Sequence, residues 1–276
     1  MPVRPAIPDS LAIMTRAAHE AGIAIMRYFR LGQTVLASAE VRDKGVNNPL
    51  TKADLEADAL LRDRLLGTHP DCGWLSEETA DNPDRLNHDR IFVVDPIDGT
   101  KEFIAGLPQF ALSLALVEAG RPVAACIHNP ATGETFTAIE GQGTRLGEQA
   151  VRTTSRDALR GATCLASRSE TARGDWEPFL SEWEIRTMGS IAYKLALVAC
   201  GRWDMTFTLS PKNEWDFCAG ALLVQEAGGR VSHKNGEPFR FNQTNPTVRS
   251  VLATNGPLHA PLLARLTDIP FAPNRR

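Results

Sequence analysis

The chain has 276 residues, of which 43% are hydrophobic and 7% aromatic, and its formal net charge is −3 at pH 7. This size allows a substantial core in one compact unit or two closely packed subdomains, and the charge and few aromatics exclude a basic or stacking surface for nucleic acid polymers. No run of about 18 to 20 apolar residues predicts a membrane span, and residues 1–10 lack the apolar segment of a signal peptide, so we expect a cytoplasmic protein.

The first predicted element is an amphipathic helix. Apolar residues recur at spacings of three and four over residues 11–29. Asp9 or Ser10 is the expected cap at its start, and Gly32 is the expected stop.

A polar, loop-like stretch over residues 41–51 precedes a second predicted helix over residues 53–66. Asp54 therefore sits at the start of a helix. The side chains expected to face the core are Leu55, Ala59, Leu60 and Leu65.

Short apolar runs follow, and they predict a mostly antiparallel set of strands. Turn-forming residues at 119–122 and 129–133 separate the last three runs. The runs cover residues 73–75, 91–94, 110–117, 123–127 and 135–139.

Beyond about residue 150, strands and helices alternate. The expected strands lie near residues 163–166, 185–187, 231 and 248–253, and the expected helices near 171–182, 190–200, 216–227 and 257–266. We expect residues 1–150 to form an α+β subdomain with an antiparallel sheet, and residues 151–276 an α/β subdomain packed directly against it. A functional site is expected where the two meet.

Acidic residues stand where an apolar strand ends. The strand within residues 91–103 delivers Asp95 and Asp98 just before Gly99 and Thr100. Two carboxylates this close repel, so one stays protonated unless a divalent cation neutralises them. Taken alone, the pair fits a capped turn as well as a metal site, because Asp, Pro, Gly and Thr are common turn residues.

Two further acidic groups favour the metal site. Glu77 follows the predicted strand at 73–75, and Asp216 opens the predicted helix at 216–227. Hard oxygen ligands from several segments suit Mg²⁺. The five cysteines lack a C-x-x-C pair and are expected as small buried residues, and the histidines lack metal-binding spacing, so we predict neither a disulfide framework nor a zinc site.

Four motifs occur together along the chain: S-E-E at 76–78, D-P-I-D-G-T at 95–100, W-D-F-C-A-G at 215–220 and E-A-G-G at 226–229. In this order and spacing they resemble the inositol monophosphatase superfamily of metal-dependent, typically lithium-sensitive phosphatases, which includes fructose-1,6-bisphosphatases. The resemblance covers nearly the whole chain. It implies an α+β fold built as a layered αβαβα sandwich.

The resemblance also implies the metal ligands. Glu77, Asp95 and the backbone carbonyl of Ile97 would bind one Mg²⁺, and Asp95, Asp98 and Asp216 would bind a second. A third, weaker ion near Glu77 would bring the number to three.

The implied catalytic residues are Asp54, Thr100 and Glu77. In the family pattern, Asp54 and Thr100 orient and deprotonate the attacking water, while the backbone of Gly99 and Thr100 contacts the phosphate. Considered on its own, Asp54 is more often a helix-capping residue.

The implied substrate contacts include Gly189 and Ser190, which open the predicted helix at 190–200, together with Lys212 and Asp216. On local grounds alone, Ser190 is an ordinary helix cap and Lys212 a solvated surface lysine.

The variants D-G-T-K-E-F-I at 98–104 and L-S-E-E at 75–78 are most similar to 3'(2'),5'-bisphosphate nucleotidases. This implies removal of the 3'-phosphate of adenosine 3',5'-bisphosphate to give AMP. In inositol monophosphatases, an acidic residue seven positions before the last metal-binding Asp holds a sugar hydroxyl, and here that position is Leu209.

Several alternatives stay open. Inositol 1-phosphate, fructose 1,6-bisphosphate and histidinol phosphate are alternative small phosphorylated substrates. A non-catalytic metal- or nucleotide-binding regulator is the alternative role, and it has no need of the pair Asp54 and Thr100. The sequence is compatible with a monomer or a homodimer.

Overall fold

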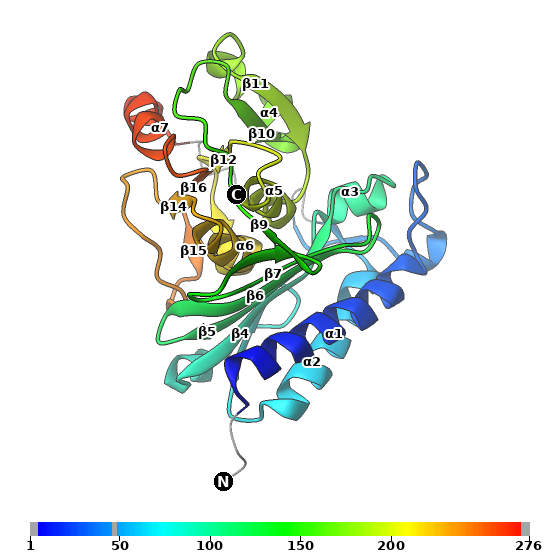
Figure 1. Cartoon of the computed structure of the whole chain (residues 1–276). Helices are drawn as coiled ribbons and strands as arrows, with labels where there is room; N and C mark the ends of the chain where they lie inside the picture. The colour runs from blue at the N-terminus through cyan, green and yellow to red at the C-terminus, as the bar shows by residue number, and fades with distance from the viewer. Residues whose placement is uncertain (1–4, 46–48, 272–276) are drawn as a thin grey trace.

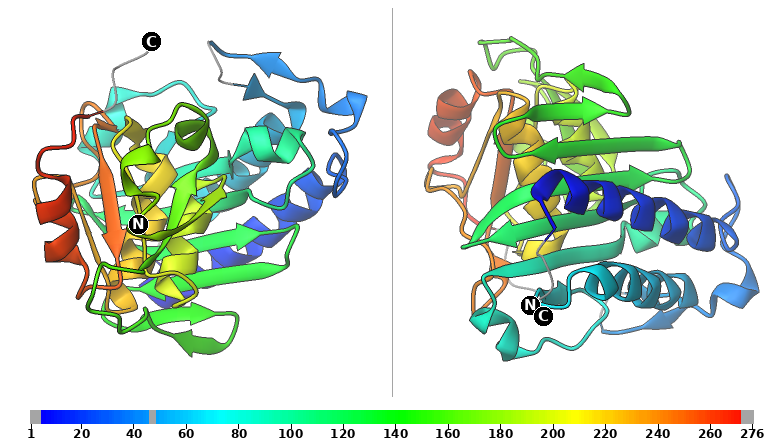
Figure 2. Two further views of the ribbon diagram at one scale, coloured as in Figure 1. Left: turned by 90° about the horizontal axis from the view of Figure 1, so that it is seen from above. Right: turned by 60° about the horizontal axis from the view of Figure 1, so that its bottom comes forward.

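The computed structural model describes residues 5–45 and 49–271, which stack in layers of helices and strands (Figure 1). Two N-terminal helices cover one face of a large sheet, and two buried helices cover its other face. A smaller sheet follows, with further helices on its outer side (Figure 2). The layers run α, β, α, β, α, so the predicted α+β sandwich is confirmed.

The larger sheet has seven strands in the order β3-β4-β5-β6-β7-β8-β9, and the smaller has five in the order β11-β10-β12-β16-β14. The strands of the larger sheet are β3 (Gly73–Ser76), β4 (Arg90–Asp98), β5 (Ala111–Glu118), β6 (Arg121–Asn129), β7 (Glu134–Ile139), β8 (Gly143–Leu146) and β9 (Gln149–Val151). The strands of the smaller sheet are β10 (Thr163–Ser167), β11 (Glu184–Met188), β12 (Met205–Thr208), β14 (Arg230–Ser232) and β16 (Val251–Thr254).

The helices and the short two-stranded ladders complete the fold. The α-helices are α1 (Ile7–Met26), α2 (Lys52–Thr68), α3 (Thr100–Ile104), α4 (Arg168–Ala172), α5 (Ile191–Ala199), α6 (Glu214–Glu226) and α7 (His259–Leu266). The ladders pair β1 (Arg42–Asp43) with β2 (Pro49–Leu50), and β13 (Lys212–Asn213) with β15 (Thr247–Val248). Of the predicted loop at 41–51, residues 46–48 lie outside the described residues. No helix in the described ranges has the length and apolar character needed to cross a membrane.

Both predicted ends of the first helix are wrong. Helix α1 starts at Ile7 without a side-chain cap, with a proline in its first turn, where a fixed backbone angle suits the helix. It ends at Met26 rather than at Gly32. Tyr28 and Phe29 follow the helix and still pack into the core, so their apolar character extended the pattern beyond the helix.

The predicted core face of α2 is only partly right: Leu65 is buried and Leu60 packs against the core, but Leu55 and Ala59 are exposed. Leu55 is 42% exposed, whereas the buried stripe combines small apolar residues with two carboxylates. Its members are Ala53, Asp54, Ala57, Asp58, Leu61 and Leu65. Burial of the two acids breaks the apolar periodicity on which the prediction rested.

Strand β4 lies in the middle of the sandwich and carries the site at its end. Phe92 and Val94 pack toward α1 and α2, while Ile91 and Val93 pack toward α5 and α6. Burial on both faces explains the continuous apolar run. Because β3 pairs parallel with β4, both strands end at the same edge of the sheet.

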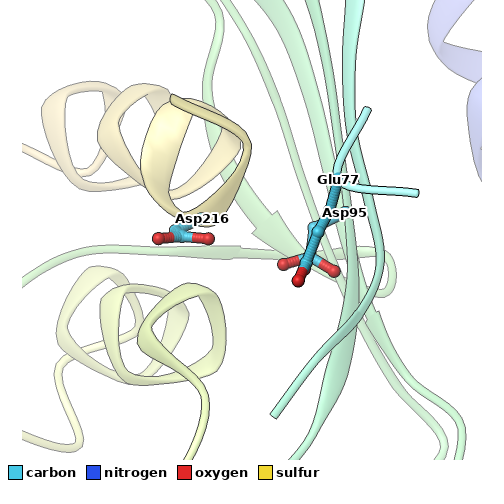
Figure 3. A group of neighbouring side chains, drawn as sticks. All are labelled: Glu77, Asp95 and Asp216. Carbon is cyan, nitrogen blue, oxygen red and sulfur yellow. The ribbon is translucent and has the colours of Figure 1, made fainter. Parts of the chain in front are cut away.

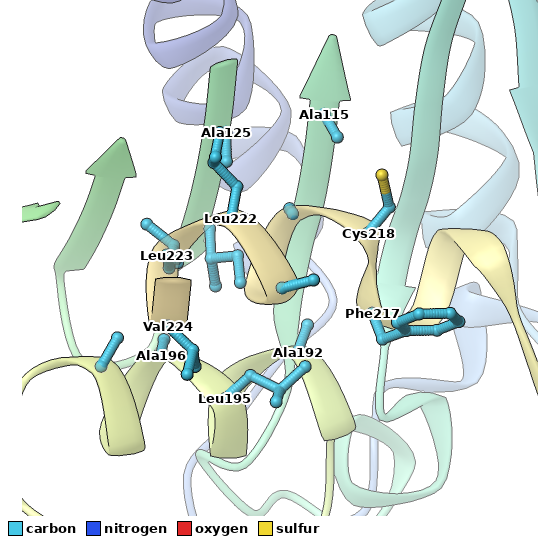
Figure 4. Close-up of a cluster of buried hydrophobic side chains, with 14 of the residues drawn as sticks. Ala115, Ala125, Ala192, Leu195, Ala196, Phe217, Cys218, Leu222, Leu223 and Val224 are labelled. Carbon is cyan, nitrogen blue, oxygen red and sulfur yellow. The ribbon is translucent and has the colours of Figure 1, made fainter. Parts of the chain in front are cut away.

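Helices α5 and α6 form the central layer between the two sheets. Figure 4 shows some of the buried side chains through which they pack on each other and on the larger sheet. Small side chains line their contact with each other and with the larger sheet, such as Ala192, Ala196, Ala115 and Ala125. They allow close approach, which places the first turns of both helices near the end of β4. Among the cysteines, all but Cys200 are buried, as predicted.

The second half of the chain differs from the prediction in three places. Strand β12 was not predicted, the predicted strand at 248–253 divides into β15 and β16, and the predicted helix at 171–182 is only α4 plus a short 3₁₀ turn. Gly174 takes a φ of +83° and interrupts that helix. The aromatic residues beyond it, Trp176 and Phe179, pack into the outer core instead.

Candidate active site

Three carboxylates from distant parts of the chain meet at one end of the sandwich (Figure 3). Glu77 follows β3 directly, Asp95 lies within β4, and Asp216 lies in the first turn of α6. Each brings a carboxylate oxygen to within 4.8 Å of the others. The structure thus brings together three of the acids that the sequence assigned to a metal centre.

Backbone amides hold two of these carboxylates in place. Asp95 Oδ1 accepts a hydrogen bond from the Ile97 amide at 3.0 Å. Asp216 Oδ2 accepts one from the Asn213 amide at 2.9 Å, as part of a capping box at the start of α6. These bonds fix both side chains before any ligand arrives.

The cluster has the electrostatics of a cation site. Burial raises the pKa of Asp95 well above its usual value, and the charges of Glu77, Asp98 and Asp216 raise it further. Burial raises the pKa of Asp216 to about 7. Buried carboxylates that repel one another need a counter-charge, and a set of hard oxygen donors fits a divalent cation such as Mg²⁺.

Asp98 lies beside this cluster, after an irregularity in the β4–β5 register between Asp95 and Asp98. Its Oδ2 accepts hydrogen bonds from Ser190 Oγ and from the Ala192 amide, each at 2.6 Å. Burial raises the pKa of Asp98, and these two bonds oppose that rise. The Ile97 carbonyl, the last predicted ligand, lies 3.1 Å from Thr100 Oγ1.

Asp54 and Thr100 are close, as the resemblance implied. Thr100 Oγ1 lies 3.2 Å from Asp54 Oδ1. Asp54 Oδ2 accepts hydrogen bonds from the amide and the hydroxyl of Thr51, so it also caps helix α2. Burial raises the pKa of Asp54 to about 6, although the bonds from Thr51 lower it. The capping role and the pairing with Thr100 use different oxygens of one carboxylate.

Gly99 forms the sharp turn between β4 and α3. Its φ is +99°, and a Cβ atom there would lie 2.8 Å from the backbone oxygen of Gln109. Only glycine fits this position without a shift of the backbone. The turn places Gly99 and Thr100 in the lining of the same cavity as the carboxylates.

These residues line a cavity of about 420 Å³ that contains both acidic and basic side chains. The acidic cluster contributes Glu77, Asp95, Asp98 and Asp216, and the basic residues around the cavity are Lys101, Arg168, Lys194 and Lys212. Gly189, Ser190 and Lys212, the predicted substrate contacts, also line it. All predicted site residues therefore face this cavity or adjoin it.

Four basic residues of the site were not predicted from the sequence, and one of them is Lys101, next to Thr100. Lys194 is only 4% exposed, and burial lowers the pKa of its ammonium group. Arg168 Nε lies 3.5 Å from Glu102 Oε1, and Lys44 Nζ lies 3.0 Å from Glu77 Oε1. A lysine inside the apolar run of α5 was a signal for Lys194, whereas nothing in the sequence distinguishes Lys44 or Arg168 from solvated surface residues.

Leu209 does not line this cavity. It is 9% exposed and packs in the outer core with Phe207 and Trp176. The position where inositol monophosphatases were expected to carry an acid is therefore part of the apolar core.

Comparison with known proteins agrees with this site. The model of the inositol monophosphatase family matches residues 9–269. An inositol-1-monophosphatase of Rhizobium meliloti is 36% identical over 227 residues, which cover 79% of this chain and 83% of the relative. The Nus factor SuhB of Escherichia coli K12 is 35% identical over 266 residues, which cover 94% of this chain and 96% of the relative.

The fold agrees as well. The structure of an IMPase from Thermotoga maritima superposes with a TM-score of 0.82 at 28% identity, covering 94% of this chain and 97% of the other. The match to the family model, over residues 9–269, includes every residue that lines the cavity. This chain therefore belongs to the inositol monophosphatase family, a family of phosphatases that cleave phosphomonoesters.

Proposed function

We propose that this protein is a Mg²⁺-dependent phosphomonoesterase whose small substrate carries a second anionic group, with adenosine 3',5'-bisphosphate as the first candidate. The supporting observation is a single cavity that is lined both by an acidic cluster and by Arg168, Lys194 and Lys212. A phosphate to be cleaved belongs at the acidic cluster with its cations. The basic side chains suit a second phosphate of the same molecule.

The cations would be held by oxygen donors, whose chemistry and crowding favour divalent metal ions. These donors are Glu77, Asp95, the Ile97 carbonyl, Asp98 and Asp216. When bound, Mg²⁺ supplies charge neutralisation on the phosphoryl oxygens and activation of a water molecule. Phosphoryl transfer gains mainly from such positioning and charge neutralisation.

Asp54 and Thr100 are proposed to align the attacking water and accept its proton. Thr100 lines the cavity, and Asp54 Oδ1 lies 3.2 Å from its hydroxyl oxygen, so the pair offers a hydroxyl and an acceptor next to the cavity. With a pKa of about 6, Asp54 is mainly ionised at pH 7 and can act as a general base. Gly99 allows its own amide and that of Thr100 to approach the phosphate closely.

Arg168 is proposed to bind the second phosphate, with Lys194 behind it. Glu102 holds Arg168 at the rim of the cavity, at a distance of 3.5 Å. Glu102 is buried and packs against Gly189, where a Cβ atom would collide with its carboxyl group. This packing is a specific reason for glycine at position 189.

Inositol 1-phosphate is the second candidate substrate, because the curated relative from Rhizobium meliloti is named an inositol-1-monophosphatase. The apolar Leu209 argues against the sugar-hydroxyl contact described for such enzymes. The cavity contains other polar groups that can contact a polyol, including Glu102 and Thr208.

The test is phosphate release from a panel of both candidates, fructose 1,6-bisphosphate, histidinol phosphate and p-nitrophenyl phosphate, with Mg²⁺ supplied and then chelated. We expect Mg²⁺-dependent release, with the highest kcat/KM on adenosine 3',5'-bisphosphate. Activity that survives chelation would contradict the proposed metal dependence. Activity confined to inositol 1-phosphate would contradict the proposed substrate.

One substitution tests binding of the second phosphate independently of cleavage of the first. Arg168→Gln should lower kcat/KM on adenosine 3',5'-bisphosphate by about 10-fold or more, the worth of one charged contact, while leaving p-nitrophenyl phosphate unaffected. Arg160→Gln, an exposed arginine outside the cavity, is the matched control. Equal loss on both substrates would show that Arg168 does not read the second phosphate.

A further inference from the structure

Asp98 is oriented by a helix from the other half of the chain. Its carboxylate comes from the end of β4, yet both hydrogen bonds to Oδ2 come from the start of α5. Ser190 Oγ donates one and the Ala192 amide donates the other, each at 2.6 Å. One oxygen of Asp98, Oδ2, is therefore committed to α5.

The Ser190 hydroxyl has both of its roles filled. It donates its only proton to Asp98, and it accepts a hydrogen bond from the Tyr193 amide at 2.9 Å. The residue is 6% exposed. While this arrangement holds, Ser190 has no proton to donate to a substrate, which is a different role from the substrate contact expected from the sequence.

The backbone at Ser190 is strained. Its φ is +48° and its ψ is 112°, in a region that glycine tolerates and other residues rarely adopt. Such a conformation costs of order 1–3 kcal/mol and persists only when the surroundings hold it. The contacts that hold it include the two hydrogen bonds of its hydroxyl.

Helix α5 is itself anchored to the larger sheet. Tyr193, three residues after Ser190, donates its hydroxyl proton to Glu134 at the start of β7, and Arg202 pairs with the same carboxylate. The start of α5 is thus held relative to the strands that carry the cluster. A rigid support of this kind is what fixes the direction of a metal ligand.

We propose that Ser190 is a positioning residue, whose hydroxyl and strained backbone orient Asp98 so that a single oxygen, Oδ1, faces the divalent cation. This inference rests on the proposed function, because it assumes that Asp98 binds metal. Groups that orient metal ligands typically change metal affinity by 10- to 100-fold. Ser190 would act through Asp98, without touching the substrate.

The test measures Mn²⁺ binding to the metal-free protein by electron paramagnetic resonance, together with thermal unfolding. Ser190→Ala and Ser190→Gly both remove the hydroxyl, but only glycine relieves the strained φ. We expect both variants to weaken one Mn²⁺ site by about 10- to 100-fold. Ser190→Gly should unfold at a higher temperature than Ser190→Ala, so that lost affinity can be separated from lost stability.

Two further variants complete the design. Ser190→Thr keeps the hydroxyl and should bind Mn²⁺ more tightly than Ser190→Ala, although its β-branched side chain adds strain at this φ, whereas Ser181→Ala, in an exposed turn, should change neither quantity. Wild-type affinity in both Ser190→Ala and Ser190→Gly would overturn this inference and leave the proposed function standing. Absence of Mn²⁺ binding in the wild-type protein would instead overturn the proposed function, and this inference with it.

Discussion

Three carboxylates of the site receive hydrogen bonds from the starts of helices. Asp54 accepts from Thr51 at the start of α2, Asp216 from Asn213 at the start of α6, and Asp98 from the first turn of α5. Free amides and the helix dipole stabilise negative charge there, which offsets part of the repulsion within the cluster. At these helix starts, the groups that cap the helix are also the groups that form or support a carboxylate of the site. This explains why Asp54 and Ser190 also fit ordinary helix caps.

The first prediction at the residue scale concerns Asp54. Asp54→Asn should lower kcat by about 10²- to 10⁴-fold, because the amide cannot accept the proton of the attacking water. The fold should persist, since an amide oxygen can still accept the hydrogen bonds from Thr51. Steady-state kinetics and thermal unfolding measure the two effects.

Asp58→Asn is the matched control. Asp58 lies one turn further along α2, is also buried, and accepts hydrogen bonds from the hydroxyls of Ser76 and Thr79. Neither acid lines the cavity, but the hydrogen bonds described for Asp58 do not involve Thr100, so its loss should reduce stability and leave kcat nearly unchanged. Equal losses of kcat in the Asp54 and Asp58 variants would remove the special role of Asp54.

At the scale of elements, the turn from β4 into α3 is the most constrained part of the site. Gly99→Ala should destabilise the protein by about 1–3 kcal/mol, because alanine is strained at a φ of +99° and its Cβ meets the backbone oxygen of Gln109. Thr100 would move with the turn, so kcat/KM should fall as well. Chemical denaturation and kinetics provide the measurements.

Gly133→Ala separates strain from collision. Gly133 has a φ of +73° in the turn between β6 and β7, and a Cβ atom there would lie more than 4 Å from every described heavy atom beyond its chain neighbours. We expect a loss of about 1 kcal/mol from the backbone alone, with unchanged kcat/KM. A Gly99 variant that behaves like the Gly133 variant would show that the close packing at Gly99 is unimportant.

Which elements could be predicted from the sequence depends on how they are buried. The strands of the larger sheet carry long apolar runs, and their existence was predicted, although β8 and β9 were missed because they are short and partly exposed. The position of helix α2 along the chain was predicted, but its buried face was not, because Asp54 and Asp58 occupy that face. Local periodicity cannot anticipate polar groups whose hydrogen-bond partners lie elsewhere in the fold.

For the molecule as a whole, the layered fold explains why the acids meet. Strands β3 and β4 end at one edge of the larger sheet, and the central layer brings the first turns of α5 and α6 to that edge. Motifs that are far apart in sequence predicted the acidic half of the site. The basic half was largely missed, because Lys44, Arg168 and Lys194 join the site only through tertiary contacts.

The pH dependence of stability is a whole-molecule prediction. Burial raises the pKa of Asp54 to about 6 and that of Asp216 to about 7, both above the ordinary value of 3.8. The folded protein therefore holds protons that the unfolded chain releases, and this stabilisation is complete below about pH 4 and lost as pH rises through 6 to 7. Without metal, these two carboxylates should lower the unfolding temperature over this range, against the opposite contribution of His128 and His259, whose pKa values burial lowers to about 4.

Mg²⁺ should reverse that trend. Binding needs ionised carboxylates and displaces their protons, so the rise in unfolding temperature on adding Mg²⁺ should be larger at pH 8 than at pH 5.5. Differential scanning calorimetry with chelator or with Mg²⁺ measures both curves. A gain that is independent of pH would mean that the cation binds away from these carboxylates.

The central claim is that Asp95 and its neighbours form the metal centre of a phosphatase, and turnover by Asp95→Asn at saturating Mg²⁺ tests it most directly. We predict a loss of about 10²- to 10³-fold or more in phosphate release, with the circular dichroism spectrum of the folded wild-type protein retained. Near-normal turnover by this variant would contradict that claim, because the most buried acid of the cluster would then be dispensable.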